Sequence, residues 1–133
     1  ILQDDSLIEK LNWDAIAHYF TLNKIILVYN NEINHPNKKI VPNGFISRNH
    51  LNLLGYIFYP LFYHYYADNY MYDLYEESGA RYKTDHISIV HKKHSKNSWA
   101  RSHLLEDKQV YKKAIDSGVI KKDAKKIIGY NNS

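Results

Sequence analysis

The fold is decided by the stretch DNYMYDLYEESGARYKTDHISIVH, residues 68–91, in which two hydrophobic periodicities follow one another. In its first half the apolar residues recur at the spacing of one helical face, and Gly79 supplies a left-handed stop. In its second half Ile87 and Ile89 alternate with their neighbours, as in a partly buried strand. The stretch therefore predicts a helix over 68–78 and extended chain after it.

Shorter signals outside this stretch indicate more elements of the same two kinds. Asn12 is a suitable cap for one helix, Gly55 closes a second, and Gly118 stops a third. The further elements that we expect are helices over 13–22, 50–54, 104–117 and 121–128, and strands over 24–29 and 44–48. Strands that alternate with helices predict the α/β class, with a partial, Rossmann-like mixed sheet flanked by helices.

Composition limits the kinds of protein that this chain can be. With 133 residues and 44% hydrophobic residues it has the material for one core. No apolar run is long enough to span a membrane, so we expect a soluble protein with a cytoplasmic location. The chain has no cysteine, so a bound metal must be held by oxygen or imidazole nitrogen.

Charge is divided unevenly along the chain. Residues 81–133 hold 13 Lys or Arg against 5 Asp or Glu, whereas residues 1–80 hold 5 against 9. A basic segment of this kind can meet nucleic acid, an anionic membrane surface or a phosphorylated substrate. The plainer interpretation is a set of solvated helix faces, which is the more common case.

Asp4 and Asp5 follow Ile1 and Leu2, which read as the end of a strand. Adjacent carboxylates repel each other unless a cation or hydrogen bonds relieve the repulsion. Hard divalent cations such as Mn²⁺ and Mg²⁺ prefer oxygen ligands, so the acidic pair is a candidate metal site. The alternative is that one of the two acids caps the following turn.

Two histidines, His91 and His94, lie just past the strand that runs into Val90. Two imidazoles three residues apart can reach one metal ion from a tight loop or a helical turn. Surface exposure without any ligand role is the alternative, since most of the eight histidines must lie on the surface.

Asp68 stands at the expected start of a helix, behind an aromatic run that ends in Tyr65 and Tyr66. A carboxylate in such a place can act as a general base. Aromatic rings beside it favour a sugar or a base as ligand, although they also form cores. The alternative role for Asp68 is that of an ordinary N-cap.

Taken in order, these segments resemble the metal-dependent glycosyltransferases of the GT-A fold, particularly the family 2-like enzymes of bacteria and phages. In that family a strand ends in an acidic metal motif and a Trp-Asp pair follows shortly. Later come an acceptor-side floor, a helix that begins with the catalytic base, and a strand that ends in a histidine near the metal. The matching residues are Asp4-Asp5, Trp13-Asp14, Pro42 to Arg48 with Leu54-Gly55-Tyr56, Asp68-Asn69, and Ile87 to His94.

The resemblance implies transfer of a sugar from a nucleotide-sugar donor to the hydroxyl of a glycan or other acceptor, with inversion. A divalent cation, Mn²⁺ or Mg²⁺, would be bound by Asp5, His91 and His94, and the cofactor-binding pair would be Asp4 with Asp5. Asp68 would be the catalytic base. The acceptor-binding residues implied are Trp13, Asp14, Tyr65, Tyr66 and Asn69.

The resemblance covers residues 1–107, which we interpret as the carboxy-terminal half of a glycosyltransferase-like domain, and residues 108–133 as a basic helical tail. The nucleotide-binding strands would lie upstream of Ile1, so these residues alone are expected to be inactive or weakly active. Residues 24–29 are then expected to expose an unpaired sheet edge, which favours self-association.

Two other interpretations remain open. The basic tail and the many tyrosines are typical of a nucleic-acid-binding module, provided that both kinds of side chain share one surface. A non-catalytic remnant of the transferase fold would keep the outline without the activity.

Overall fold

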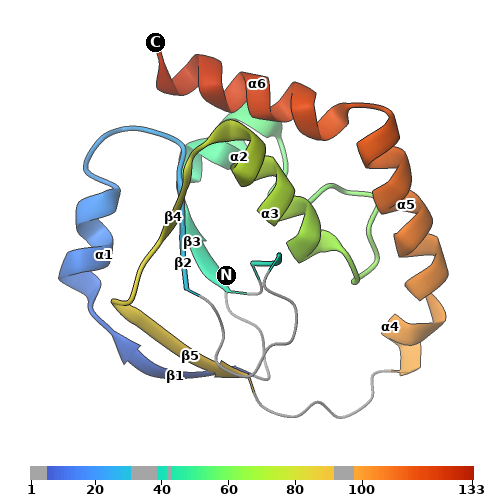
Figure 1. Ribbon diagram of the computed structural model, residues 1–133, viewed down its shortest axis with the longest axis horizontal. Helices are drawn as coiled ribbons and strands as arrows, with labels where there is room; N and C mark the ends of the chain where they lie inside the picture. Colours follow the sequence, from blue (N-terminus) through green and yellow to red (C-terminus); the bar gives the residue numbers. More distant parts are fainter. Residues whose placement is uncertain (1–5, 31–38, 42, 92–97) are drawn as a thin grey trace.

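The computed structural model describes residues 6–30, 39–41, 43–91 and 98–133, and these form a mixed α/β structure (Figure 1). The predicted α/β class is confirmed at this level. The elements are β1 (Ser6–Leu11), α1 (Trp13–Tyr19), β2 (Leu27–Tyr29), β3 (Gly44–Ile46), α2 (Arg48–Leu54), α3 (Ala67–Ser78), β4 (Arg81–Lys83), β5 (Ile87–His91), α4 (Ser98–Ser102), α5 (Leu104–Asp116) and α6 (Val119–Asn131).

The larger sheet has the strand order β3-β2-β4, with β2 antiparallel to β3 and parallel to β4. Its central strand β2 is buried on both faces, and Leu27 and Val28 are each 0% exposed. Leu27 packs towards α3 and α6, whereas Val28 packs with Ile16 of α1 and with β5. The expectation that residues 24–29 form an exposed edge is therefore wrong, because both long sides of β2 are paired.

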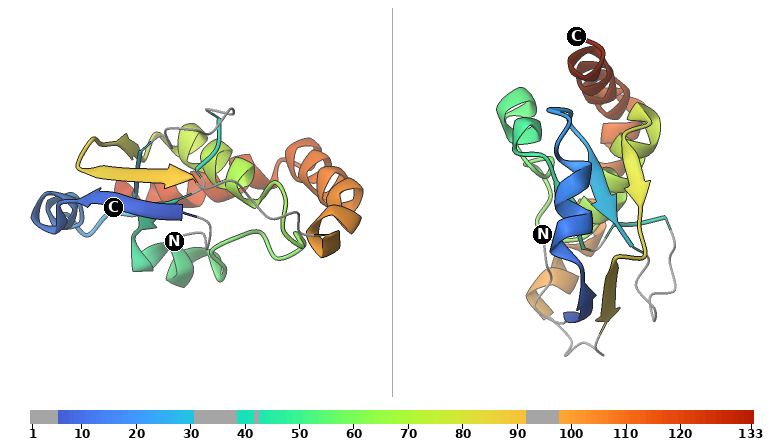
Figure 2. Two further views of the ribbon diagram at one scale, coloured as in Figure 1. Left: turned by 90° about the horizontal axis from the view of Figure 1, so that it is seen from below. Right: turned by 90° about the vertical axis from the view of Figure 1, so that its left-hand side faces the viewer.

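The smaller sheet is a two-stranded ribbon in which β1 pairs antiparallel with β5. Ile87 and Ile89 of β5 are buried at 3% exposure each, and their neighbours Ser88 and Val90 are only partly buried, which confirms the predicted alternation. The molecule is elongated, with α1 at one end and α4 and α5 at the other (Figure 2).

Helix α6 packs along α3 and belongs to the main core. It contributes the buried side chains of Ile120, Ala124 and Ile127. The proposed boundary between residues 107 and 108 falls inside α5. The segment interpreted as a basic helical tail is helical, and its helix α6 shares the main core with α3.

Several predicted boundaries shift because side chains replace or extend backbone hydrogen bonds. The expected strand over 24–29 shortens because the amide of Asn131 binds both backbone groups of Ile25 (Oδ1 to N 2.7 Å, Nδ2 to O 2.9 Å). The same contact anchors the last turn of α6, which runs past Gly129. Helix α1 ends early, where the Thr21 hydroxyl donates to the His18 carbonyl at 2.8 Å.

The glycine stops were predicted correctly. Gly55, Gly79 and Gly118 all adopt positive φ angles next to helix ends. Helix α4 was not predicted, because five residues are too few to show a periodicity. Among the described residues, no helix has both the length and the apolar character needed to cross a bilayer.

Candidate functional site

The register of the β1–β5 ribbon determines which predicted residues can meet. Ser6 pairs with His91, and Leu7 pairs with Val90, so the first residue of β1 lies opposite the last residue of β5. Asp4, Asp5 and His94 lie outside the described residues, and only the backbone of His91 is described. Within the described part of the chain, no three metal-ligating side chains come together.

A β-bulge shapes the face of this ribbon that points to the larger sheet. The pairing shifts between Ile8 and Lys10, which leaves Glu9 as the extra residue. Simple alternation would put residues 8 and 10 on one face, but the extra residue brings Leu11 to the face of Ile8 instead. Bulges commonly re-aim side chains in this way beside functional sites.

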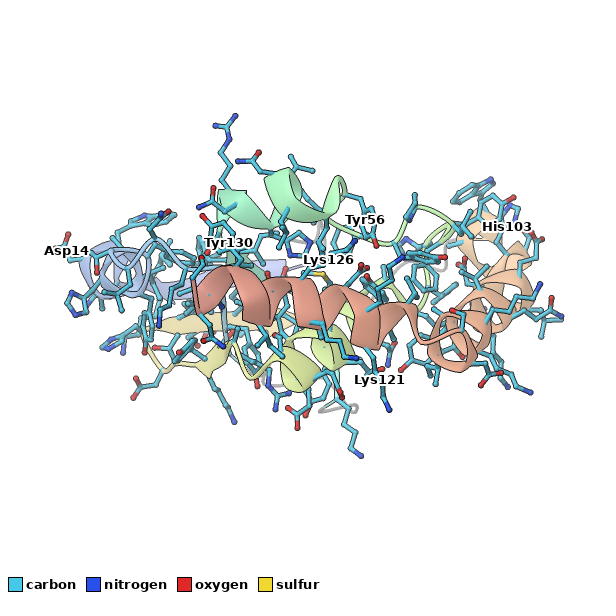
Figure 3. All side chains as sticks on the ribbon, turned by 90° about the horizontal axis from the view of Figure 1, so that it is seen from above. Asp14, Tyr56, His103, Lys121, Lys126 and Tyr130 are labelled. Atoms are coloured by element: carbon cyan, nitrogen blue, oxygen red, sulfur yellow. The ribbon has the colours of Figure 1, made fainter. Side chains whose placement is uncertain are left out.

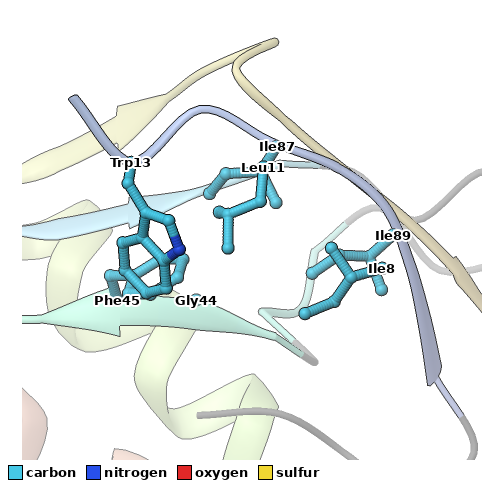
Figure 4. A pocket seen from close by; sticks show the side chains of 7 residues that line it. All are labelled: Ile8, Leu11, Trp13, Gly44, Phe45, Ile87 and Ile89. Atoms are coloured by element: carbon cyan, nitrogen blue, oxygen red, sulfur yellow. The ribbon is translucent and has the colours of Figure 1, made fainter. Parts of the chain in front are cut away.

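These side chains line an apolar pocket of about 210 Å³ between the ribbon and β3 (Figure 4). Ile8 with Ile89 and Leu11 with Ile87 form cross-strand pairs along one wall. The full lining is Ile8, Leu11, Trp13, Gly44, Phe45, Ile87 and Ile89. Such a pocket suits an apolar ring or short chain, and among its lining side chains the indole N–H of Trp13 is the one hydrogen-bond donor.

Trp13 and Asp14 begin α1, immediately after its cap. Asn12 Oδ1 accepts a hydrogen bond from the Ala15 amide at 3.2 Å, which confirms the predicted N-cap. Trp13 packs edge-on against Phe45, with ring centroids 5.3 Å apart, yet stays 60% exposed. Asp14 is exposed, and its charge is favourable near a helix N-terminus. The Trp13 ring is thus held at the pocket and remains available to a ligand.

Asp68 and Asn69 lie in the first turn of α3 and are half-buried. The N-cap of α3 is Tyr66, so the alternative role of Asp68 as N-cap is wrong. Tyr66 has a φ of 66°, a left-handed conformation that is uncommon for a bulky residue. The backbone therefore turns at Tyr66, where the aromatic run ends and α3 begins.

The aromatic rings before α3 pack in different directions. Tyr66 stacks on Tyr111 of α5 with centroids 5.2 Å apart, and Tyr65 lies edge-on to His64. Trp13, in contrast, packs on Phe45. Among the described residues, the predicted acceptor-binding residues therefore form two groups, one with Trp13 and one with Tyr65 and Tyr66, and do not line one common surface.

Asp107 fixes the chain before α3, a role that sequence reasoning missed. Asp107 is 0% exposed, and its carboxylate accepts hydrogen bonds from the backbone amides of Tyr63, His64 and Tyr65 at 2.7, 3.0 and 2.8 Å. Three amide donors satisfy a buried carboxylate that would otherwise be costly to desolvate. Asp107 therefore positions Tyr65 and, through it, the start of α3.

Asp123 plays a similar part on α6. Asp123 is 1% exposed, and its carboxylate accepts hydrogen bonds from the hydroxyl groups of Tyr70, at 3.0 Å, and of Tyr56. Lys126 lies 3.3 Å away, and Figure 3 shows Tyr56 and Lys126 beside α6. Burial, together with the bond to Asp123, raises the pKa of Tyr56 to about 12, and burial also raises the pKa of Tyr70. Both hydroxyls therefore stay protonated donors at neutral pH.

A third buried polar contact joins α2 to α3. His50 is 0% exposed, its Nδ1 lies 2.8 Å from the Tyr75 hydroxyl, and the two rings stack with centroids 5.7 Å apart. Burial lowers the pKa of His50, because the charged imidazolium loses its water. Desolvation also raises the pKa of Tyr75. The pair is therefore neutral and structural.

A signal for the buried acids was present in the sequence. Asp123 lies three residues after Ile120 and four before Ile127, and Asp107 lies seven before Ala114, so both follow the buried stripe of their helices.

Comparisons with known protein families, with characterised proteins and with solved structures found no match to this chain.

Proposed function

We propose that this chain supplies the metal-binding and acceptor side of a nucleotide-sugar glycosyltransferase. The observation that carries the proposal is the register of Ser6 opposite His91. Asp5 directly precedes Ser6 in the sequence, and His94 follows His91 by three residues. The proposal therefore depends on the described pairing of Ser6 with His91 and on these sequence neighbours.

The donor set fits the proposed cofactor. Carboxylate oxygens from Asp4 or Asp5 are suitable ligands for Mn²⁺ or Mg²⁺, and an imidazole nitrogen from His91 or His94 would favour Mn²⁺, because Mg²⁺ prefers oxygen ligands. When bound, such a cation would supply positive charge beside the diphosphate leaving group. In the sequence, Asp4 and Asp5 come just before β1, His91 is the last residue of β5, and His94 follows it.

The arrangement of the larger sheet supports the fold that the proposal requires. Strands β2 and β4 are parallel neighbours, and α3 precedes β4 in the connection between them. A strand, a crossover helix and a parallel strand are the unit of Rossmann-like sheets. We therefore propose that the β3-β2-β4 sheet is part of the larger sheet of a GT-A-like fold.

In the proposed reaction, Asp68 accepts the proton of the acceptor hydroxyl while the oxygen attacks the anomeric carbon. The bond from that carbon to the diphosphate oxygen breaks on the opposite face, so the configuration inverts. Asn69 would contact the acceptor beside Asp68, with Tyr65 and Tyr66 shaping the approach, whereas Trp13 and Asp14 form a separate group and would contact a more distant part of the acceptor. A cytoplasmic location belongs to the same proposal, since the chain needs no oxidising compartment.

Asp68→Asn tests the proposal in an assay of sugar transfer from a nucleotide-sugar donor. The amide keeps the shape of the carboxylate but cannot accept a proton, so kcat should fall about 10²- to 10⁴-fold with little change in KM. Glu77→Gln, an exposed change on the same helix, should leave both constants unaltered. Near-normal turnover of Asp68→Asn would exclude Asp68 as the base.

A further inference from the structure

Helix α5 has an exposed apolar strip beside the face that it buries. Its buried side carries Asp107 and Ala114 against the rest of the protein. On the solvent side, Leu105 is 72% exposed, Ile115 51% and Leu104 39%. Scattered exposed aliphatic residues are ordinary, but three on one helix of 13 residues are not a random scatter.

Two lysines lie among these aliphatic side chains. Lys108 follows Leu104 by four residues and Leu105 by three, and Lys112 follows Lys108 by four. Residues three and four apart share one side of a helix, so they form a single surface. We call the surface made by Leu104, Leu105, Lys108, Lys112 and Ile115 the outer face of α5.

The surroundings of the outer face are strongly basic. All eight Lys and Arg residues between Ser98 and Ser133 are exposed, against four acidic residues. Two of those acids, Asp107 and Asp123, are buried and engaged by internal donors. Of the exposed acids, Glu106 pairs with His103. The positive charge at the surface therefore exceeds what the residue count of these helices suggests.

We propose that the outer face of α5 docks the protein on the surface of an anionic lipid bilayer. Aliphatic side chains between lysines are the composition of helices that lie in the interface, with the apolar groups among the acyl chains and the lysines at the phosphates. Nucleic acid would use the same charge, but Leu105 and Ile115 cannot stack on bases as aromatic rings do. The inference does not depend on the glycosyltransferase proposal.

The position of the helix suits such docking. Helices α4 and α5 form one end of the molecule, away from α1 (Figures 1 and 2). Trp99 of α4 is 56% exposed and precedes the outer face in the chain. Tryptophan is enriched at membrane interfaces, because its ring is apolar and its N–H is polar. An end-on or side-on contact through α5 leaves the β1–β5 ribbon in solution.

Cosedimentation with vesicles tests the proposal on the 133-residue chain. Vesicles of phosphatidylcholine with about 30% phosphatidylserine should bind the protein, and binding should weaken as salt is raised. Lys108→Gln with Lys112→Gln should weaken binding about 30-fold, at about fivefold per charge. Lys24→Gln with Lys83→Gln removes equal charge from exposed sites on other elements and should have a much smaller effect.

The apolar contribution needs its own variants. Leu105→Gln with Ile115→Gln should weaken vesicle binding about tenfold, whereas Leu22→Gln with Leu51→Gln should not, although Leu22 is 67% exposed. Leu105→Trp, in a background with Trp13→Phe and Trp99→Phe, places the only tryptophan on the outer face of α5. Its fluorescence emission should shift to shorter wavelength when anionic vesicles are added, and brominated lipid in the vesicles should quench it.

Three results would overturn the proposal. The first is no binding to anionic vesicles at low salt, or equal loss with both lysine pairs. The second is an emission of Leu105→Trp that vesicles leave unchanged. The third is tighter binding of a single-stranded oligonucleotide through the same lysines, or a dimer in sedimentation that buries Leu105. Circular dichroism of each variant separates lost binding from lost folding.

Discussion

The helical side of the molecule, formed by α3, α5 and α6, buries acidic side chains, whereas the β1–β5 ribbon leaves apolar side chains exposed. On the helical side, Asp107 and Asp123 are almost fully buried and each accepts several hydrogen bonds. On the ribbon side, Ile8 and Trp13 are 42% and 60% exposed beside an open apolar pocket. The buried acids therefore contribute to the packing of the helices, whereas the ribbon side keeps apolar side chains exposed to solvent.

The largest effect should follow from Asp107→Ala. The substitution leaves the backbone amides of residues 63–65 without their acceptor, and buried unsatisfied amides cost about 1–3 kcal/mol each. Partial relaxation and entry of water should limit the total loss to about 3 kcal/mol of unfolding free energy. Urea unfolding followed by circular dichroism measures it.

Asp116→Asn is the matched control, since Asp116 ends the same helix and is exposed. Its effect should stay within about 0.5 kcal/mol. If Asp107→Ala were as mild as this control, residues 63–65 would not depend on the carboxylate, and the contrast between the two sides of the molecule would fail.

A smaller effect should come from the titration of His50. Burial lowers the pKa of His50 in the folded state, so the unfolded state binds the proton more readily. This contribution to stability is fully present above the unfolded pKa of about 6.5 and is lost as the pH falls towards the folded pKa. The loss cannot exceed about 1.4 kcal/mol per pH unit for this group.

Unfolding free energies at about pH 7.5 and about pH 5.5 measure the effect of His50. His50→Gln should be less stable than the wild type at the higher pH but lose less stability on acidification. His18→Gln, an exposed change in α1, is the control for the substitution itself and should leave the unfolding free energy at about pH 7.5 close to that of the wild type. An unchanged slope in His50→Gln would mean that the buried ring does not titrate in this way.

The smallest effect is expected on the ribbon side, from Trp13→Ala. Although tryptophan is large, Trp13 is 60% exposed and packs edge-on against Phe45, so it has little buried area to lose. We expect a loss below about 1 kcal/mol in urea unfolding. A loss above about 2 kcal/mol would show that Trp13 belongs to the core, and would end the distinction between the two regions.

Local signals predicted much of the fold. The apolar spacing of α3, the stop at Gly79 and the cap at Asn12 all depend on residues close in sequence, and all three are confirmed. The pairing of β2 on both sides could not be predicted, since it depends on residues 44–46 and 81–83. The clasp of Asn131 on Ile25 joins residues 106 positions apart and leaves no local trace.

The candidate site was predictable to a smaller extent. The order of the motifs suggested the roles of Asp68, Trp13 and the acidic pair, and these roles stay predictions. The bulge at Glu9 and the pocket that it shapes depend on the register with β5, which no local pattern fixes. Asp107 and Asp123 resembled surface acids in lysine-rich helices, because burial depends on packing across elements.

The most direct test of the central claim is paramagnetic broadening of amide resonances by Mn²⁺ in the 133-residue chain. We expect broadening centred on Ser6 and His91. It should be lost in Asp5→Asn and retained in Asp85→Asn, a change of an exposed acid between β4 and β5. Broadening that is absent, or that centres elsewhere and survives Asp5→Asn, would contradict a metal site at this end of the ribbon and with it the proposed transferase.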